Sequence, residues 1–258
     1  MKSTYRILPT AALAALLTLG TAAQASTTSA GRYDARIQSS VEQKLDKKAE
    51  FRNVNSTVED GIVTLTGSVE NYKQKLDAEK QARKADKAKG VRNLIEVAGP
   101  SVRDAELQAK LQKKLAYDRA GYNDVAFNAI TVNVKHGVVT LGGDAATYPA
   151  ANDAVALATN MAGVKEVVNE INVLPTSIFD DNLRVRTYRA IYRDPVLSKY
   201  AMDPQRPIRI IVNGGHIGLF GEVDSQMDKT IAYMRASQVF GGFSVENHLT
   251  LPNQTALR

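Results

Sequence analysis

The sequence predicts an α+β protein made of three tandem copies of a small α-β-β-α-β unit, each with a three-stranded sheet and two helices. The first observation behind this prediction is a repeated strand: DGIVTLTGSV at 60–69 recurs as HGVVTLGGDA at 136–145 and as GHIGLFGEV at 215–223. The second is that other landmarks of each copy keep the same spacing. The third is that each copy ends at a proline.

The motif positions of the three copies align throughout. The first glycines stand 76 and 78 residues apart, and the second glycines and the closing V-x-N-x-[IL]-x-[VL] strands repeat at the same two offsets. Self-similarity at a nearly constant period indicates tandem copies of one structural unit. These structural motif positions are Gly61, Gly67 and Asn93 in copy one, Gly137, Gly143 and Asn169 in copy two, and Gly215, Gly221 and Asn247 in copy three.

Prolines divide the chain into units. Pro100, Pro175 and Pro252 end the three copies, and the segments AGPS and LPTS predict short linkers between compact domains. A chain of 258 residues is long enough for three small domains. The third copy is the most divergent, since a glycine interrupts its repeated strand. The sequence therefore predicts a signal peptide at 1–25 and domains at 26–100, 101–175 and 176–258.

Each copy is expected to begin with an amphipathic helix. In copy one, apolar side chains recur every four residues, which places them on one face of a helix. Copy two shows the same spacing with three leucines, and Pro195 closes the helix of copy three. The expected buried stripes are Tyr33, Ile37, Val41 and Leu45; Leu107, Leu111 and Leu115; and Phe179, Leu183, Ala190 and Ile191.

A β-hairpin is expected next. The segment VNSTV and its counterparts ITVNV and IRIIV place apolar residues at alternate positions, and period two indicates a strand with one buried face. The turns EDG, KHG and NGG supply the positive φ that a tight hairpin needs. In copy one, Val63 and Leu65 then share the buried face of the second strand. Gly67 marks the strand exit, where a bulge or a close backbone approach is expected.

The second helix of each copy has a stripe of small residues. Spacings of four and three place these residues on one face, and small side chains let the helix lie close to the sheet. The closing strand follows, and a strand-helix-strand crossover of normal hand puts both helices on one face of the sheet. The stripe is Ala78, Ala82 and Ala85, then Ala154, Ala158 and Met161, then Ala232, Ala236 and Val239.

Together these features resemble the BON domain, the bacterial osmotically inducible protein Y and nodulation domain family. The resemblance rests on the G-x-V-x-L-x-G strand after a hairpin, the alanine-rich helix and the V-x-N-x-[IL]-x-V strand, and it covers essentially the whole chain after residue 25. The chain departs from the family at the turn before the last strand, where the family has Gly-Val. Copy two has Gly163 and Val164 there, whereas copy one has Lys87 and copy three follows Gly241 with Gly242.

The resemblance implies a non-enzymatic, envelope-associated protein that binds phospholipid or membrane surfaces, often under osmotic or envelope stress. The family has no catalytic motif, so no active-site residue and no cofactor carry over. The implied partner is an anionic phospholipid or membrane surface, with envelope proteins as a second class. Nucleic acid is not an expected partner, because a formal charge of +6 is mild for this length and the chain is expected to be exported.

The first 25 residues match a cleavable signal peptide. Lys2 and Arg6 form a basic start, the apolar core ILPTAALAALLTLGTAA follows, and Ala23-Gln24-Ala25 is an A-x-A cleavage site. An uncleaved anchor is the alternative, but the apolar run is short for a membrane span and no basic flank follows it. We therefore expect cleavage after Ala25 and a mature protein in the periplasm.

Catalytic and metal-binding constellations are not found in the sequence. There are no cysteines, which excludes disulfides and thiolate ligands. The histidines His136, His216 and His248 lack metal-ligand spacing. No G-x-S-x-G motif occurs and no pair of carboxylates repeats among the copies. We expect no metal site and no enzyme activity.

A basic helix face in copy one is the first candidate binding surface. On a helix over 72–89, four lysines lie opposite the alanine stripe. They could bind anionic head groups, each contributing about 1 kcal/mol near such a surface. The alternative is an ordinary solvated face, because acidic residues are interleaved. The lysines are Lys73, Lys80, Lys84 and Lys87.

The first helix of copy three carries the second candidate surface. Tyrosine and arginine side chains lie on the flank away from its expected core stripe. Tyrosine favours the head-group region of a membrane and arginine pairs with phosphate. Packing of these side chains on copy two or on the segment 194–202 is the alternative, since aromatic and arginine residues are also enriched at protein contacts. The residues are Arg184, Tyr188, Arg189 and Tyr192.

Two functions remain open from the sequence alone. The first is a peripheral protein of the periplasm that binds lipid surfaces through its modules. The second is an interaction scaffold that docks an envelope protein or the cell wall, in which tethering of three modules raises their effective concentration. The basic face of copy one separates them, because charge reversal there should weaken only lipid binding.

Overall fold

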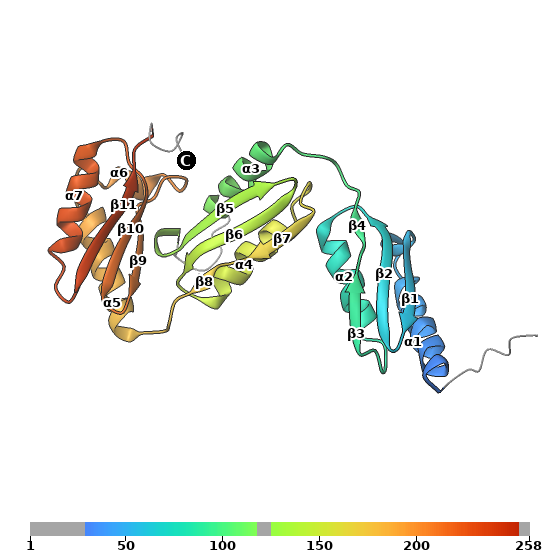
Figure 1. Cartoon of the computed structure of the whole chain (residues 1–258). Helices are drawn as coiled ribbons and strands as arrows, with labels where there is room; N and C mark the ends of the chain where they lie inside the picture. The colour runs from blue at the N-terminus through green and yellow to red at the C-terminus, as the bar shows by residue number, and fades with distance from the viewer. Residues whose placement is uncertain (1–28, 118–124, 253–258) are drawn as a thin grey trace, which may run out of the picture.

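The computed structural model describes residues 29–117 and 125–252, which form three small domains in a row (Figure 1). The expected signal peptide at 1–25 lies outside the described residues. Each domain has one small sheet covered by helices, which confirms the predicted α+β fold of three similar units. We refer to the units as domains 1, 2 and 3.

The predicted α-β-β-α-β order is present in every domain, with short elements added to it. Domain 1 comprises α1 (Ser29–Leu45), the short 3-10 helix η1 (Ala49–Phe51), β1 (Val54–Glu59), β2 (Ile62–Val69), α2 (Tyr72–Arg83), β3 (Gly90–Asn93) and β4 (Glu96–Val97). Domain 2 comprises α3 (Asp104–Tyr117), η2 (Val125–Phe127), β5 (Ala129–Lys135), β6 (Val138–Ala145), α4 (Tyr148–Thr159), β7 (Glu166–Asn169) and β8 (Asn172–Val173). Domain 3 comprises α5 (Ile178–Tyr192), α6 (Lys199–Met202), β9 (Arg209–Asn213), β10 (His216–Glu222), α7 (Gln226–Ser237) and β11 (Ser244–Thr250).

The second strand is the centre of each sheet. β2 pairs antiparallel with β1 and parallel with β3, and β6 and β10 pair in the same way with their neighbours. The closing strand is split in domains 1 and 2, where β4 and β8 continue the pairing after a break. In domain 3 it runs unbroken as β11.

The motif asparagine joins the closing strand to the second helix. The Asn93 side chain donates to the carbonyl of Lys75 in α2 at 2.9 Å and accepts from the Ile95 backbone N–H at 3.2 Å. Asn247 repeats both bonds in domain 3, to the carbonyl of Lys229 and from the N–H of Leu249. The asparagine therefore ties the last strand to the second helix.

Each core lies between a sheet and two helices on the same face. In domain 1, Val63 and Leu65 of β2 are buried against Ile37 of α1 and Ala78 of α2. Burial of a side chain such as leucine contributes about 1.5–3 kcal/mol relative to exposure. The predicted alanine stripe is confirmed in all domains, with every alanine buried and Met161 and Val239 partly buried.

The second motif glycine is required by a close backbone approach, as predicted. At Gly67 φ is +103°, and an added Cβ would lie 1.9 Å from the carbonyl oxygen of Asn53. Gly143 and Gly221 have positive φ and similar contacts. No other residue fits such a position without moving the neighbouring strand.

A carboxylate caps the hairpin turn of every domain, which sequence reasoning did not find. In domain 3, the Asp180 oxygens accept from the backbone N–H groups of Gly214 and Gly215 at 2.9 and 2.8 Å. Asp34 and Asp104 make the same paired contacts in domains 1 and 2. The two backbone hydrogen bonds lower the pKa of the Asp104 carboxyl. The first helix is thereby fixed to the hairpin.

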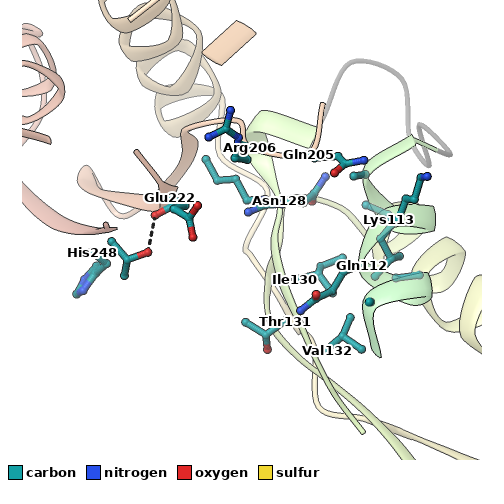
Figure 2. A pocket seen from close by; sticks show the side chains of 18 residues that line it. Gln112, Lys113, Asn128, Ile130, Thr131, Val132, Gln205, Arg206, Glu222 and His248 are labelled. Atoms are coloured by element: carbon teal, nitrogen blue, oxygen red, sulfur yellow. Dashed lines mark hydrogen bonds between the residues drawn. The ribbon is translucent and has the colours of Figure 1, made fainter. Parts of the chain in front are cut away.

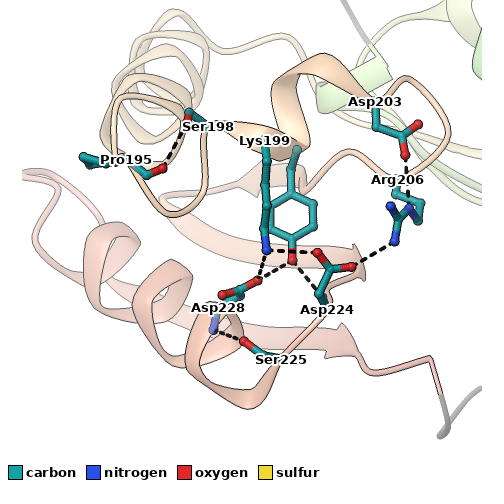
Figure 3. Close-up of polar contacts among 9 residues, drawn as sticks. Pro195, Ser198, Lys199, Asp203, Arg206, Asp224, Ser225 and Asp228 are labelled. Atoms are coloured by element: carbon teal, nitrogen blue, oxygen red, sulfur yellow. Dashed lines mark hydrogen bonds and ion pairs between the residues drawn. The ribbon is translucent and has the colours of Figure 1, made fainter.

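Domain 3 has an insertion between its first helix and first strand that seals one side of the core. Tyr200 of α6 is buried, and its hydroxyl donates to Asp228 and accepts from the Asp224 backbone N–H at 2.7 Å. Lys199 lies between the same two carboxylates, at 2.8 and 2.9 Å (Figure 3). Burial, followed by the hydrogen bond to Asp228, raises the pKa of Tyr200 to about 12.

The expected core stripe of α5 is wrong in part. Phe179 is exposed and Ala190 is half-buried, whereas Leu183 and Ile191 are buried as predicted. The buried face instead includes Thr187, whose hydroxyl donates to the carbonyl of Leu183 at 2.8 Å. Thr187 lies four residues after Leu183 and four before Ile191, so the three side chains share one face of the helix.

Candidate binding surfaces

The four lysines of the predicted basic face are all exposed: Lys73, Lys80, Lys84 and Lys87. The expected helix over 72–89 is too long, because α2 ends at Arg83 with Lys84 as its C-cap. Lys73 and Lys80 therefore lie on the helix, and Lys87 belongs to the turn that follows. The basic face is a helix flank that continues into a turn.

Ion pairs within α2 neutralise part of its positive charge. The Lys73 ammonium lies 2.6 Å from the Asp77 carboxylate, whose hydrogen bond raises the pKa of Lys73. Arg83 pairs with Glu79 at 2.7 Å. Lys80, Lys84 and Lys87 form no ion pair with any residue in the described ranges of the chain. Their three charges remain available to an external anion, and all three lie toward the C-terminal end of α2.

Lys87 has an unusual backbone conformation. Its φ is +66°, as in Gly163 and Gly241 at the equivalent turns, and this region is rare for residues other than glycine. Its ammonium stands 4.4 Å from the centre of the Tyr33 ring. The two side chains border a small cavity of about 210 Å³ beside the capped hairpin turn, which Lys89 also lines. The cation is thus held at the end of domain 1.

The predicted exposed flank of α5 is wrong at two of its four residues. Arg184 is buried, pairs with Asp181, and donates to the carbonyl of Val212 at 3.0 Å. Tyr192 is buried, and its hydroxyl donates to the carbonyl of Ile208 at 2.8 Å. Burial raises the pKa of Tyr192. Both side chains support the fold of domain 3 and cannot face a membrane.

Tyr188 follows the alternative that these side chains pack on the second domain. Its ring lies 4.5 Å from the Tyr192 ring and 5.7 Å from the Phe127 ring of η2, measured between centroids. Arg189 is exposed. Two of the four side chains on the α5 flank therefore pack within domain 3 and one contacts domain 2, so the helix presents fewer groups to a ligand than its sequence indicates.

A cleft of about 700 Å³ lies between domains 2 and 3. In Figure 2, Lys113 and Ile130 of domain 2 lie on one side, and Glu222 and His248 of domain 3 lie on the other. Arg209 lines the same cleft, and burial lowers the pKa of its guanidinium. The cleft has mixed chemistry, since aliphatic and polar or charged side chains both line it.

The described residues offer no arrangement typical of a metal centre. Within 29–117 and 125–252, no three histidine, aspartate or glutamate side chains gather where they could hold a metal ion. The His216 ring instead contacts the Ser244 hydroxyl at 2.7 Å, and the His248 ring stacks on Phe220. In the same ranges, every helix is too short or too polar to cross a bilayer.

Family comparison covers most of the chain. The sequence model of the BON domain matches three times, at residues 33–99, 103–175 and 180–253. Each match contains one hairpin, one alanine-rich helix and one closing strand of the structure. The matches confirm the resemblance found in the sequence motifs.

Individual relatives add little about activity. An uncharacterized protein in the gshII 5′ region of Anaplasma centrale is 27% identical over 146 residues, which cover 54% of this chain and 94% of that protein. Among solved structures, the C-terminal domain of CdsD, a structural protein of the type III secretion system of Chlamydia trachomatis, is 14% identical, with a TM-score of 0.23, and the alignment covers 83% of this chain and 96% of that one. The periplasmic domain of PrgH from S. typhimurium is 11% identical, with a TM-score of 0.21 and coverage of 81% and 98%. Likeness at this level supports no functional inference.

Proposed function

Because the chain belongs to the BON domain family, with three tandem domains, we propose that it is a non-enzymatic periplasmic protein that binds anionic membrane surfaces. The observation that carries the proposal is the group of unpaired, exposed lysines at the end of domain 1. Lys80, Lys84 and Lys87 have no carboxylate partner in the described residues, and Lys87 is held in place by the Tyr33 ring.

Electrostatics make this group suited to a charged surface. Each lysine near an anionic leaflet contributes about 1 kcal/mol, so three contribute about 3 kcal/mol. The attraction acts over about 10 Å at 0.1 M salt and weakens as salt rises. Binding of this kind is reversible and is sensitive to ionic strength, which fits a peripheral protein better than an anchored one.

Export is part of the proposal and rests on residues 1–25. Their basic start, apolar core and A-x-A site predict cleavage after Ala25. The mass of the protein purified from a periplasmic extract should match a chain that begins at Ser26. Recovery of the uncleaved chain in the membrane fraction would contradict this prediction. A role in osmotic or envelope stress follows only from the family.

Vesicle co-sedimentation tests the proposal directly. The full mature chain is mixed at low salt with vesicles of phosphatidylcholine alone or with added phosphatidylglycerol. We expect several-fold more protein to pellet with the anionic vesicles, because the lysines attract only a charged surface. Equal pelleting with both compositions would refute the proposal.

Charge reversal locates the surface. The variant Lys80→Glu, Lys84→Glu, Lys87→Glu should lose most of its binding to anionic vesicles at low salt. A matched control reverses three exposed cations elsewhere, Lys113→Glu, Lys135→Glu and Arg193→Glu. If the control loses as much binding as the first variant, the net charge of the chain and not this surface accounts for attachment.

A second candidate function is a scaffold that docks an envelope protein. The cleft between domains 2 and 3 favours it, since a chain segment could enter between Ile130 and His248. A pull-down from envelope extract should then retain one protein at a constant ratio. Recovery of lipid alone would count against the scaffold.

A further inference from the structure

The three domains differ from one another in one side chain at their corresponding ends. This end contains the hairpin turn and the turn before the closing strand. In domains 1 and 2 the side chains of Lys89 and Lys165 cover the hairpin glycines, and an added Cβ on Gly61 or Gly137 would meet them at 3.1 Å. In domain 3 the ring of Phe243 occupies this place. The hairpin glycine is thus covered by a lysine side chain in domains 1 and 2 and by a phenylalanine ring in domain 3.

Three further exposed apolar side chains belong to this region: Phe179, which stacks on Phe243; Ile178, next to Phe179 in the sequence; and Phe240, three residues before Phe243. Phe240 is 89% exposed, Ile178 81%, Phe243 74% and Phe179 45%. The rings of Phe179 and Phe243 are stacked, with centroids 6.3 Å apart and planes at 26°. We call these four residues the aromatic end of domain 3. Single exposed apolar residues are normal, but a cluster of large ones marks a site of interaction.

Arg186, which has no ion-pair partner among the described residues, lies close to Phe179 of this cluster. A Cβ on Gly241 would lie 3.3 Å from the Arg186 Nη2 and 3.6 Å from the Phe179 ring. The Nε atoms of Arg184 and Arg186 are both buried without a hydrogen bond. The two residues differ in that Arg184 pairs with Asp181, whereas no carboxylate of the described residues pairs with the Arg186 guanidinium. The half-buried guanidinium of Arg186 therefore lacks a counter-ion among the described residues, and an external anionic oxygen could supply one.

We propose that the aromatic end of domain 3 inserts into an anionic phospholipid bilayer, with Arg186 binding a lipid phosphate. The inference rests on the proposed function and adds an apolar contact that the lysines of domain 1 do not supply. The order of groups fits a bilayer: the rings are outermost and the guanidinium lies behind them, as acyl chains lie beneath phosphates.

The placement of the domains supports a shared surface. In Figure 1 the turns at this end of domain 3, between β9 and β10 and between α7 and β11, point to the lower edge of the view. The turns between β1 and β2 and between α2 and β3 of domain 1 point to the same edge. In this view the two ends therefore lie on the same side of the chain, as contact with one membrane requires.

A fluorescent reporter tests insertion in the full mature chain. The protein has no tryptophan, so Phe240→Trp introduces a single indole at the most exposed residue of the aromatic end. With phosphatidylglycerol vesicles we expect a blue-shifted emission and strong quenching by bromine atoms on the acyl chains. Unchanged emission on vesicles that demonstrably bind the variant would overturn this inference and leave the proposed function intact. Failure of the wild-type chain to bind any vesicle would overturn both.

Two variants measure the contribution of the aromatic end. Phe240→Ala with Phe243→Lys copies the lysine of the other domains and should keep the fold. At high salt, where the lysines of domain 1 are screened, its vesicle binding should fall at least tenfold. The control Met202→Ala with Met227→Ala removes two other exposed apolar side chains and should bind like wild type. Equal losses in both variants would refute a specific role for this end.

A third variant tests the phosphate contact. Arg186→Gln should reduce the preference for phosphatidylglycerol over phosphatidylcholine several-fold, while Phe240→Trp fluorescence in the same background still reports insertion. An unchanged preference would show that Arg186 binds no lipid phosphate. If the wild-type chain binds no vesicles but captures a single envelope protein, the aromatic end is a protein contact instead.

Discussion

Domains 1 and 3 have the same fold and the same pair of turns, yet their ends differ in chemistry. Domain 1 presents Lys87 over Tyr33, with Lys89 across the hairpin turn. Domain 3 presents stacked rings of Phe179 and Phe243 in the corresponding place. The backbone of the module is fixed by glycines, alanines and a capping aspartate, which leaves these surface positions free to specialise.

The comparison suggests two modes of attachment in one chain. The end of domain 1 attracts a charged surface from a distance, and its effect is weakened by salt. The aromatic end of domain 3 acts only on contact, through burial of apolar area, and salt affects it little. Variants that damage one domain at a time separate the contributions of domains 1 and 3.

The largest expected effect comes from Gly67→Ala. The new Cβ would lie 1.9 Å from the Asn53 oxygen at a residue with φ of +103°, so domain 1 should lose about 3 kcal/mol of stability. Urea unfolding followed by circular dichroism should show an early transition for one domain. Gly90→Ala is the matched control, since its Cβ would meet nothing within 4 Å. A single unchanged transition would contradict this account of the glycine.

A smaller loss is expected in domain 3 from Tyr200→Phe. The change removes the donor to Asp228 and the acceptor for the Asp224 backbone N–H, which should cost about 2 kcal/mol. Thermal unfolding should show the loss in domain 3 alone. Tyr233→Phe, at an exposed tyrosine, should leave unfolding unchanged. Comparable effects of the two variants would mean that the buried network of Figure 3 contributes little.

At the turn before the closing strand, replacing glycine by lysine in domain 2 should cost more stability than replacing lysine by glycine in domain 1. Gly163→Lys in domain 2 should cost about 2 kcal/mol, because φ is +92° and a Cβ would lie 2.6 Å from Val102. Lys87→Gly in domain 1 relieves backbone strain but loses the contact with Tyr33, so the net change should stay below about 0.5 kcal/mol. Chemical denaturation measures both. Equal costs in the two directions would show that the turns are not equivalent.

The smallest effect concerns acid stability. The pKa of Asp104 is lowered in the folded state by hydrogen bonds from the His136 and Gly137 backbone. Its contribution is therefore complete above the unfolded pKa of about 4 and is lost as the pH falls through the lower folded value. Asp104→Asn should flatten the fall of melting temperature below about pH 4. A parallel pH profile in wild type and variant would exclude this carboxylate as a cause.

Sequence reasoning identified the elements that depend on local pattern. Hairpin strands, the alanine stripe and the glycine pair follow from periodicity and backbone conformation, so Val63, Ala78 and Gly67 could be placed without a structure. The aspartate that caps each hairpin was missed. Asp34, Asp104 and Asp180 are separated by 70 and 76 residues, because the loop after the first helix varies in length, whereas the strand motifs repeat at 76 and 78.

Surface positions were harder to predict because their burial depends on distant segments. Arg184 and Tyr192 were expected to be exposed, but they bond to carbonyls at Val212 and Ile208 in or beside β9. Tyr188 meets Phe127 of another domain. The aromatic end of domain 3 could have been found from Phe240 and Phe243, which stand where the other copies have no aromatic residue.

The most direct test is a salt titration of vesicle binding by three forms of the full mature chain: wild type, the triple lysine reversal in domain 1, and Phe240→Ala with Phe243→Lys. We predict that the lysine reversal removes most of the salt dependence but keeps the binding that persists at high salt. The aromatic variant should show the opposite pattern, with the slope retained and the high-salt binding lost. Identical curves for the two variants would contradict the claim that domains 1 and 3 bind the membrane by different means.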